Sequence, residues 1–390
     1  MITACPVCEA QRAEPVWDIA DAQIFQLLRM GEPLDLEPFA AVELVRCQRC
    51  AHLYNQSYEA SLADRMYGGE VLSNVPVHVS MSKSLEQIAA WIGQDLLAGK
   101  RVLEIGGGSG HLARILARTA KRVWVFEPCR GLRAESLPEA NITLRHEPYA
   151  AGRVEEPVEL MVCRQVLEHV ADPLAMLREI RSALSADGCC YLEVPSAEYI
   201  EEHAALFDLH CFHVQYFHAP NLLRLAARAG FGVVRSWQLK QGHDVGVLLR
   251  PQPAAAITDR PASALTAAGL RARLSERLEQ LRAWLTSLDG AVSLYGATAQ
   301  GGSFLHTFQA DRRFVAVADD NPDYAGYALY SQAQTVPVVL PWHESFRRSD
   351  HVILTAYLHD VVLTERLRSS GFDGTIFSLR DPVPSLTLEA

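Results

Sequence analysis

Four cysteines near the start of the chain stand in two pairs, Cys5-Pro-Val-Cys8 and Cys47-Gln-Arg-Cys50. A gap of two residues lets both thiolates of one turn face the same ion, and two such turns supply the sulfur ligands of a tetrahedral zinc site. Because a zinc ion with four sulfur ligands has no open position for a reacting water, we expect this Zn2+ to stabilise the fold. The alternatives are unrelated thiols and a redox pair; the redox pair is less favoured because the motif occurs twice.

A glycine-rich segment follows a predicted strand further along the chain. Residues 101–110 (Arg-Val-Leu-Glu-Ile-Gly-Gly-Gly-Ser-Gly) begin as a predicted strand and end in a glycine turn, and residues 111–118 favour a helix. Glycines let the backbone approach a ligand closely, and the start of a helix offers free N–H groups. Counted from Gly108, the segment also matches GxGxxA, a tolerated variant of the dinucleotide pattern, so the loop alone leaves a dinucleotide open.

Acidic and polar residues follow the next predicted strands. The strand predicted over 122–126 ends in Glu127, and a carboxylate at this place can accept two hydrogen bonds from a vicinal diol. The strand predicted over 159–163 runs into Arg164-Gln-Val-Leu-Glu-His-Val170 and then Asp172-Pro173, and residues 188–195 favour one more strand. In open α/β sheets, ligands bind at the carboxyl ends of such strands.

These segments together resemble class I S-adenosylmethionine (SAM)-dependent methyltransferases. The matching patterns are VLEHV-x-DP and ExGxGxG, the latter formed by Glu104, Gly106, Gly108 and Gly110. The resemblance implies a Rossmann-like domain whose glycine loop wraps the aminocarboxypropyl end of SAM. It further implies that Glu127 holds the ribose hydroxyls, Gln165 lies along SAM and Glu147 lies on the adenine side. Tight turns of another α/β fold, dinucleotide binders included, are the alternative.

The chain of 390 residues divides into segments of different character. At about 100–200 residues per domain, this length suggests two or three domains. We expect a zinc-binding module over 1–60, a SAM-binding methyltransferase domain over 61–250, a linker rich in Pro and Ala over 251–264, and a C-terminal Rossmann-like domain over 265–390. Alternating strands and helices predict parallel sheets covered on both faces, which is an α/β fold.

The C-terminal segment repeats the alternation. Residues 292–295, 314–318 and 351–355 favour buried strands, and the leucines between 270 and 288 lie on one helical stripe. A glycine turn follows the first of these strands, and Asp319 and Asp320 follow the second. Two interpretations stay open: a structural layer with tight turns, or a pocket for a nucleotide or sugar group.

Composition excludes several classes of function. Lys and Arg number 36 against 46 Asp and Glu, a formal net charge of −10, and an acidic chain is poorly suited to bind a nucleic-acid backbone. No apolar run approaches the roughly 20 residues of a membrane helix, and the first residues lack the pattern of a signal peptide. Nine cysteines, an odd number, do not fit a fully paired secreted framework, so we expect a cytoplasmic protein. The expected partner is a small-molecule substrate.

A narrower resemblance covers nearly the whole chain. The cysteine pairs, the SAM domain and a C-terminal segment with YGATAxG and DDNP resemble C-methyltransferases of nucleotide-linked 4-ketosugars. This resemblance implies that a base removes the proton beside the ketone and that the enolate carbon attacks the methyl group of SAM. We therefore expect C-methylation of a nucleotide-linked ketosugar in a cleft between the two Rossmann-like domains. The alternatives are O- or N-methylation of another small metabolite and a non-enzyme that binds SAM or a partner.

The residues for proton removal are where this sequence departs from the family. His213 matches the family histidine, but the glutamate that precedes it in the family is Phe212 here. The family tyrosine falls on Ser73 or Asn74, and an HGGS-like segment is reduced to Gly242-His243-Asp244-Val245. The scaffold therefore matches better than the acid–base set.

His213 is the candidate base, because histidine titrates near neutral pH. We expect it to work with His210 or Tyr67 as partners in place of the missing family residues. His169 of the VLEHV segment is a further catalytic candidate. For each of these histidines, packing or capping is the alternative interpretation.

Overall fold

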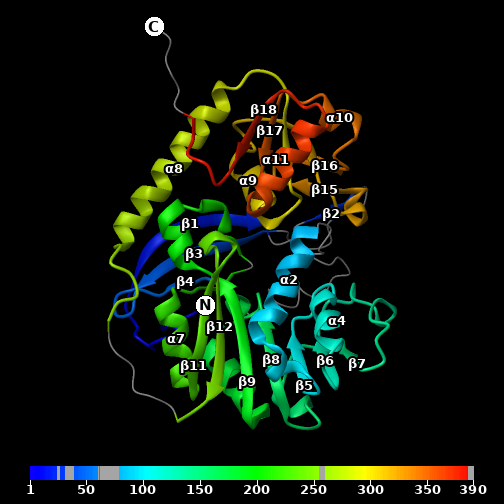
Figure 1. The fold of residues 1–390 in the computed structure, drawn as a ribbon. Coiled ribbons are helices and arrows are strands. Elements are labelled where there is room, and N and C mark those ends of the chain that lie inside the picture. Colours follow the sequence, from blue (N-terminus) through cyan, green and yellow to red (C-terminus); the bar gives the residue numbers. More distant parts are fainter. Residues whose placement is uncertain are drawn as a thin grey trace. The chain divides into compact units, whose positions relative to one another are not determined.

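The computed structural model describes residues 1–23, 27–30, 39–59, 61, 79–211, 213–253 and 260–384. The chain forms two compact units (Figure 1); the first comprises 1–15, 43–199 and 212–264, and the second 16–42, 200–211 and 265–390. The α/β fold class predicted from the sequence is confirmed, whereas the predicted domain boundaries stay predictions. Tyr67, Ser73, Asn74 and Phe212 lie outside the described residues. In the described part of the chain, no helix is long and apolar enough to cross a membrane.

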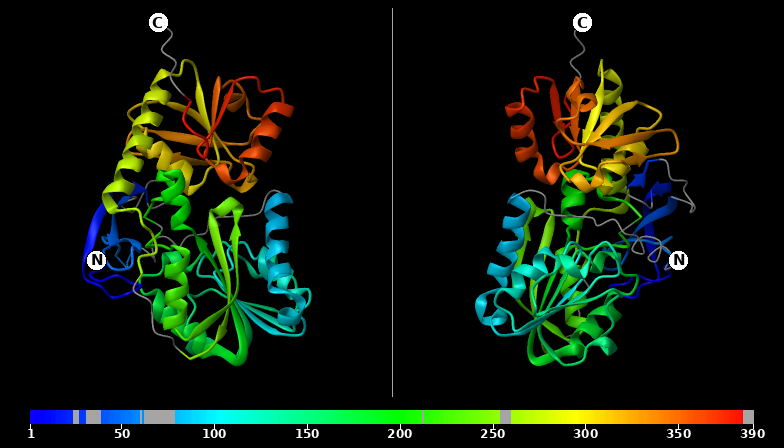
Figure 2. Two further views of the ribbon diagram at one scale, coloured as in Figure 1. Left: turned by 60° about the vertical axis from the view of Figure 1, so that its left-hand side comes forward. Right: turned by 90° about the vertical axis from the view of Figure 1, so that its right-hand side faces the viewer.

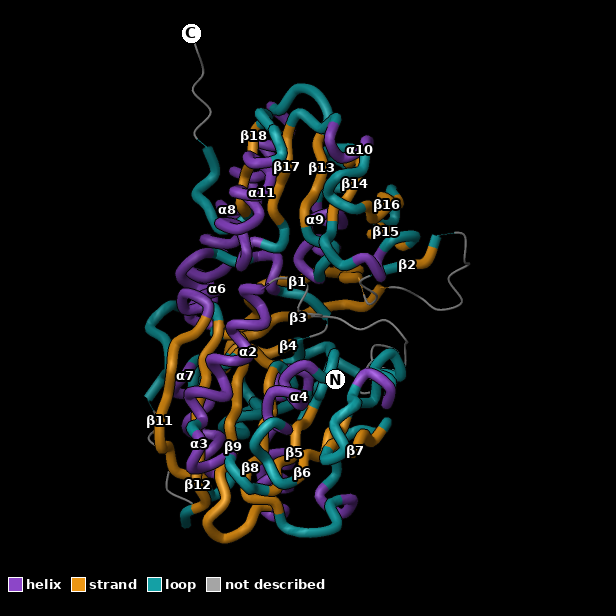
Figure 3. The backbone as a smooth tube through the Cα atoms, turned by 45° about the vertical axis from the view of Figure 1, so that its right-hand side comes forward, coloured by secondary structure: helices purple, strands orange, loops and turns teal. Residues whose placement is uncertain are grey.

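A seven-stranded sheet organises the first unit (Figure 3). Its strands in spatial order are β11 (Phe231–Leu239), β12 (Asp244–Pro251), β9 (Leu184–Pro195), β8 (Val158–Arg164), β5 (Arg101–Ile105), β6 (Arg122–Phe126) and β7 (Ile142–Arg145). The strands from β9 to β7 run parallel, whereas β12 lies antiparallel between β9 and β11. The carboxyl ends of the parallel strands and the amino end of β12 therefore lie at one edge.

Helices cover both faces of this sheet because its strands are apolar on both sides. Val123 and Val125 of β6 pack in one core with α2 (Val79–Ile92), α3 (Gln94–Leu97) and α4 (His111–Ala117). The alternate residues Trp124 and Phe126 pack in the other core with α5 (Pro173–Ala183) and α7 (Ala219–Arg228). Strands that are buried on both faces show continuous apolar runs, which is why the sequence predicts strands at β5 and β6, the latter with its observed bounds.

A smaller sheet joins the cysteine pairs to a distant part of the chain. Its strands in order are β1 (Ala13–Gln23), β3 (Phe39–Cys47), β4 (Leu53–Asn55) and β10 (Gln215–Tyr216). Cys47 ends β3, and Cys50 lies in the turn before β4. Because Gln215 pairs with Tyr54 and Tyr216 with Leu53, the segment that follows His213 is held against the cysteine module.

The second unit contains its own seven-stranded sheet. The spatial order is β18 (Thr375–Ser378), β17 (His351–Leu354), β13 (Val292–Tyr295), β14 (Phe314–Ala318), β16 (Thr335–Val339), β15 (Tyr327–Tyr330) and β2 (Leu28–Arg29). The strands from β18 to β16 are parallel, and β15 and β2 are antiparallel. The three strands predicted for this segment correspond to β13, β14 and β17, the last ending one residue earlier than predicted.

Helices also cover both faces of the second sheet (Figure 2). Leu363 and Leu367 of α11 (Asp360–Ser369), with Phe346 of α10 (Glu344–Arg347), pack in a core against alternate residues of β13, β14 and β17. On β18, the Phe377 ring contacts Trp284 of α8 (Ala267–Ser287), with ring centroids 4.3 Å apart. α8 is the helix predicted from the leucine stripe. α9 (Ala299–Thr307) follows β13, and α6 (Ala197–His203) follows β9 of the first unit.

Candidate functional site

The glycine loop after β5 has a backbone that side chains would disturb. Gly106, Gly108 and Gly110 have φ angles of 72°, 52° and 75°, in the left-handed region that favours glycine. A Cβ atom on Gly107 would lie 2.2 Å from Cγ1 of Val125, so β6 and the loop pack too closely for a side chain. A Cβ atom on Gly108 would meet no heavy atom within 4 Å, which leaves the backbone at Gly108 accessible to a ligand.

Glu127, directly after β6, is hydrogen-bonded to this loop. Its carboxylate accepts hydrogen bonds from the N–H groups of Gly108 (2.7 Å) and Cys129 (2.8 Å). Burial raises the pKa of Glu127, although the two N–H groups oppose this shift. Each carboxylate oxygen can accept more than one hydrogen bond, so the group retains capacity to accept from a diol. Glu127 and the glycine loop therefore hold each other in position.

Glu104 lies on β5, directly below the loop, and is 3% exposed. Its Oε2 has no hydrogen-bond partner among the described residues. Burial, together with the nearby charge of Glu127, raises the pKa of Glu104 to about 8, although Arg164 opposes the shift. At neutral pH this carboxyl group is mostly protonated and can donate a hydrogen bond.

We expect Glu104→Gln to reduce the pH dependence of folding stability. A carboxyl group with a pKa of about 8 when folded and about 4.3 when unfolded binds its proton more tightly in the folded state, so the folded chain loses stability as the pH rises through this interval. Between pH 5 and 8, the free energy of unfolding should fall by on the order of 1–4 kcal/mol more in the native chain than in the variant. Urea titrations measure the difference, with the exposed Glu135→Gln as control. An equal fall of the free energy of unfolding in the native chain, Glu104→Gln and Glu135→Gln would contradict the prediction.

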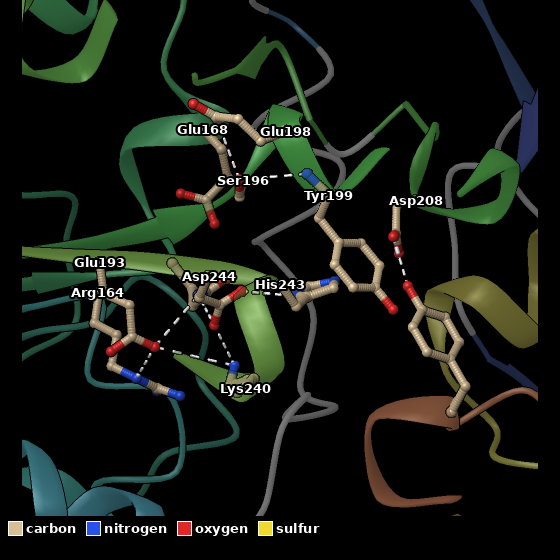
Figure 4. A network of polar contacts seen from close by, with 12 residues as sticks. Arg164, Glu168, Glu193, Ser196, Glu198, Tyr199, Asp208, Lys240, His243 and Asp244 are labelled. Atoms are coloured by element: carbon tan, nitrogen blue, oxygen red, sulfur yellow. Dashed lines mark hydrogen bonds and ion pairs between the residues drawn. The ribbon is translucent and has the colours of Figure 1, made fainter. Parts of the chain in front are cut away.

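Gln165 connects the end of β8 to the start of β12. Its backbone has a φ of 54°, and its Nε2 donates a hydrogen bond of 2.9 Å to Oδ2 of Asp244. The preceding Arg164 donates from Nε to Oε1 of Glu193 at 2.9 Å, and the Tyr191 hydroxyl donates to Oε2 of Glu193 at 2.9 Å. Three neighbouring strands therefore contribute to one polar network at the same sheet edge (Figure 4).

A histidine and an aspartate form the centre of this network. Oδ1 of Asp244 lies 2.6 Å from Nδ1 of His243, and Nζ of Lys240 lies 2.5 Å from Oδ2 of Asp244. Burial alone would raise the pKa of Asp244, but the charges of Lys240 and His243 outweigh it and lower that pKa. Because an ionised carboxylate only accepts hydrogen bonds, Nδ1 of His243 carries a proton, and a neutral ring has its lone pair on Nε2. This arrangement orients a histidine for proton transfer.

His243, Asp244, Lys240 and Glu193 were not predicted as site residues. The signal was present in the segment Gly242-His243-Asp244-Val245, which follows β11 and precedes an apolar strand. Antiparallel pairing places Asp244 opposite Pro195 at the end of β9, and the N–H of Ser196 donates to the His243 carbonyl at 2.8 Å. A prediction of β12 as the antiparallel neighbour of β9 would have placed these side chains at the ligand-binding edge.

The predicted candidates His169 and His213 lie together, with a third residue that was not predicted. Their ring centroids are 5.0 Å apart, and Nε2 of His169 lies 3.9 Å from Oε1 of Glu168. One ligand atom of each of the three residues lies within 4.8 Å of the others. His210 belongs to the second unit. Glu147 lies beyond β7, where its carboxylate is 3.6 Å from Arg153.

The VLEHV-x-DP segment also has a structural role. The Asp172 carboxylate accepts a hydrogen bond from the N–H of Ala175 and caps α5, in which Pro173 is the first residue. Aspartate at the cap and proline at the first helical position are both favoured at a helix start. The segment therefore starts a helix immediately after the loop that carries Glu168 and His169.

The sulfur atoms of the two cysteine pairs lie around one point. The Sγ atoms of Cys5 and Cys50 are 3.6 Å apart, and those of Cys8 and Cys47 are 3.5 Å apart. Zn–S bonds of about 2.3 Å in a tetrahedron place the sulfurs about 3.8 Å apart, whereas a disulfide bond is about 2.05 Å long. The observed separations fit a zinc site and do not fit disulfides.

Part of the chain matches known methyltransferases. The model of a family described as a methyltransferase domain matches residues 77–236. A ubiquinone biosynthesis O-methyltransferase of Xanthomonas campestris pv. campestris is 30% identical over 140 residues, 34% of this chain and 57% of that protein. A protein-L-isoaspartate O-methyltransferase of Anaeromyxobacter dehalogenans is 30% identical over 151 residues, 36% of this chain and 69% of that protein.

A similar solved structure is magnesium protoporphyrin IX methyltransferase from Synechocystis PCC 6803 with bound SAH. The similarity covers 48% of this chain and 91% of that chain, with 18% sequence identity and a TM-score of 0.37. The chain spans little more than half the length of the ubiquinone biosynthesis relative. From the family match and the isoaspartate relative, the chain belongs to the class I SAM-dependent methyltransferases.

Proposed function

We propose that this protein transfers the methyl group of SAM to a carbon atom beside a ketone, and that the acceptor is a nucleotide-linked ketosugar. The observation that carries methyl transfer is the loop at Gly106–Gly110, which is hydrogen-bonded to Glu127 at the ligand-binding edge of the sheet. The ketosugar is supported by the order of segments along the whole chain, from the cysteine pairs to the C-terminal α/β unit.

The cofactor site uses residues from three strand ends. In this proposal, the backbone of Gly106–Gly110 would hold the amino-acid end of SAM, Glu127 would accept hydrogen bonds from the ribose, and Gln165 would lie along the cofactor. SAM supplies an electrophilic methyl group on its sulfonium. The side chains around it must therefore bind the cofactor and deliver a nucleophilic acceptor atom in line with the S–CH3 bond.

Proton removal from the acceptor is assigned to His243. The proton of the C–H bond beside the ketone passes to Nε2 of His243, and the electron pair of that bond forms an enolate. The enolate carbon then attacks the methyl group, and SAH leaves with the electron pair of the broken S–CH3 bond. Asp244 supports this role because its carboxylate orients the ring and stabilises the imidazolium that forms.

The sequence prediction placed the base at His213, and that assignment stays a prediction. His243 is preferred because Asp244 lies 2.6 Å from its Nδ1, which defines both the ring orientation and the tautomer. The His213 ring instead lies beside another histidine, His169, with the ring centroids 5.0 Å apart. The two assignments predict different variants to be inactive.

O-methylation is the second candidate function. It is favoured by the similarity of about a third of this chain to two kinds of O-methyltransferase, which cover 34% and 36% of it. The same His243–Asp244 pair can take a proton from a hydroxyl group, after which the oxygen attacks the methyl group directly. This route needs a base and correct orientation, but no enolate.

The cysteine module is proposed to hold a structural zinc ion. The ligands are Cys5, Cys8, Cys47 and Cys50, whose Sγ separations fit a tetrahedral site. Because β10 pairs with β4 of this module, the ion would also fix the segment that begins at His213.

Methyl-labelled SAM tests the proposed function directly. The purified chain is incubated with labelled SAM and a nucleoside-diphosphate 4-keto-6-deoxyhexose, and the product is examined by NMR. We expect the label on the carbon beside the ketone, which re-forms when the enolate carbon attacks the methyl group. A label on oxygen would favour the second candidate. Binding of SAM without turnover over a panel of nucleotide-linked ketosugars would overturn the proposed acceptor.

Glu127→Gln is expected to weaken SAM binding by about 10–100-fold, because a hydrogen bond to a charged group contributes roughly 1.5–3 kcal/mol. Calorimetry with SAM measures this change, and Glu135→Gln is the exposed control. Since Glu127 also holds the N–H of Gly108, thermal melting must show that the variant is folded. An unchanged Kd in a folded Glu127→Gln variant would remove this residue from the cofactor site.

A further inference from the structure

We propose that Glu168, His169 and His213 bind one divalent transition-metal ion, at a site separate from the cysteine module. One ligand atom from each residue lies within 4.8 Å of the other two. Metal–ligand bonds of about 2.0–2.2 Å require these atoms to approach to roughly 3–3.5 Å of one another. Side-chain rotations that shorten these separations would bring the three ligand atoms around one ion.

The carboxylate of Glu168 is the strongest indication of a missing ligand. The residue is 1% exposed, and neither carboxylate oxygen has a hydrogen-bond partner among the described residues. An ionised carboxylate without partners is costly to bury. A cation in the cluster would supply the partner that the described residues do not provide.

The charges around Glu168 also favour a cation. The negatively charged carboxylates of Asp244 and Glu193 act on Glu168, and the ammonium group of Lys240 opposes them. These acids make the surroundings unfavourable for a further anion and favourable for a dication.

The elements that carry the ligands are held together. Glu168 and His169 lie in the short 3-10 helix Leu167–His169, directly before α5. The N–H of Val214 donates to the carbonyl of Glu168 at 2.8 Å, which fixes the backbone beside His213. Two imidazoles and one carboxylate suit zinc, cobalt, iron or nickel better than magnesium or calcium. Because the His169 side chain is 19% exposed, the site is accessible from outside the core.

A consequence for the acceptor follows, and it rests on the proposed function. Three protein ligands leave coordination positions for a small molecule. Neighbouring carbonyl and hydroxyl oxygens, as in an α-hydroxyketone, would fill two of them, and a metal ion polarises a carbonyl group as a Lewis acid. His213 would then serve as a ligand, and the proton would pass to His243.

Cobalt binding tests the site without SAM or acceptor. The full chain, with its cysteine module metal-loaded, is titrated with Co2+ by calorimetry and visible spectroscopy. We expect one additional Co2+ per chain, with a nitrogen and oxygen spectrum that lacks the intense thiolate bands. Glu168→Gln should weaken binding by at least about 10–100-fold, and the exposed His203→Gln should not. Because methyl transfer is not measured, failure of the proposed function leaves this result unaffected.

Two outcomes would overturn the proposal. One is a native chain that binds no more Co2+ than a His169→Gln/His213→Gln double variant. The other is a spectrum in which all bound Co2+ has sulfur ligands. If Glu168→Gln does not fold, as circular dichroism would show, the half-buried His213→Gln takes its place, and unchanged Co2+ affinity in that variant overturns the site equally.

Discussion

Replacement of His243 by glutamine is expected to lower kcat for methyl transfer by about 100–10,000-fold, the usual contribution of a positioned base. The Kd for SAM should stay unchanged, because His243 is not among the residues proposed to hold the cofactor. Stopped assays with labelled SAM and the acceptor give kcat, and calorimetry gives the Kd. The substitution keeps an amide of similar size but removes the group that accepts the proton.

Asp244→Asn tests whether methyl transfer depends on the orientation and tautomer of the His243 ring. The carboxylate lies 2.6 Å from Nδ1 of His243, and an amide at this place can donate to Nδ1 and leave the ring proton on Nε2. The ring would then present a donor where a base is needed, so kcat should fall and its pH profile should change. The exposed His203→Gln is the control. If His243→Gln keeps full methyl-transfer activity and only His213→Gln loses it, the base is His213, as predicted from the sequence.

Replacement of Cys47 by serine is expected to remove the structural zinc and to destabilise the first unit. Metal binding in small zinc modules contributes on the order of 10 kcal/mol, and this binding energy is folding energy. The loss should reach beyond the cysteine turns, because β4 of this module pairs with β10. Elemental analysis gives the zinc content, and thermal melting gives the stability.

Cys129→Ser is the matched control for this experiment. Cys129 is a half-buried thiol outside the cysteine cluster, so its removal should leave zinc content and melting temperature unchanged. A native chain purified without zinc, or a Cys47→Ser variant that melts at the native temperature, would contradict the assignment of a structural metal.

Features that depend on neighbours in sequence were predictable. A CxxC turn and a glycine loop after an apolar strand each act within a few residues, so their spacing is visible without the fold. This is why the sequence predicts a strand before the glycine loop and the bounds of β6. Continuous apolar runs likewise indicated sheets that are covered on both faces.

The proposed acid–base residues could be identified only from the tertiary structure. His243 and Asp244 reach the ligand-binding edge only because β12 runs antiparallel beside β9, and no local pattern specifies which strand inserts there. Glu168 meets His213 across 45 positions of sequence through the loop that β10 holds. The sequence, through its resemblance to class I methyltransferases, determined where a methyl donor is expected to bind. Strand pairing decided which buried charges lie at the proposed acceptor site, because burial and the approach of distant side chains exist only in the folded chain.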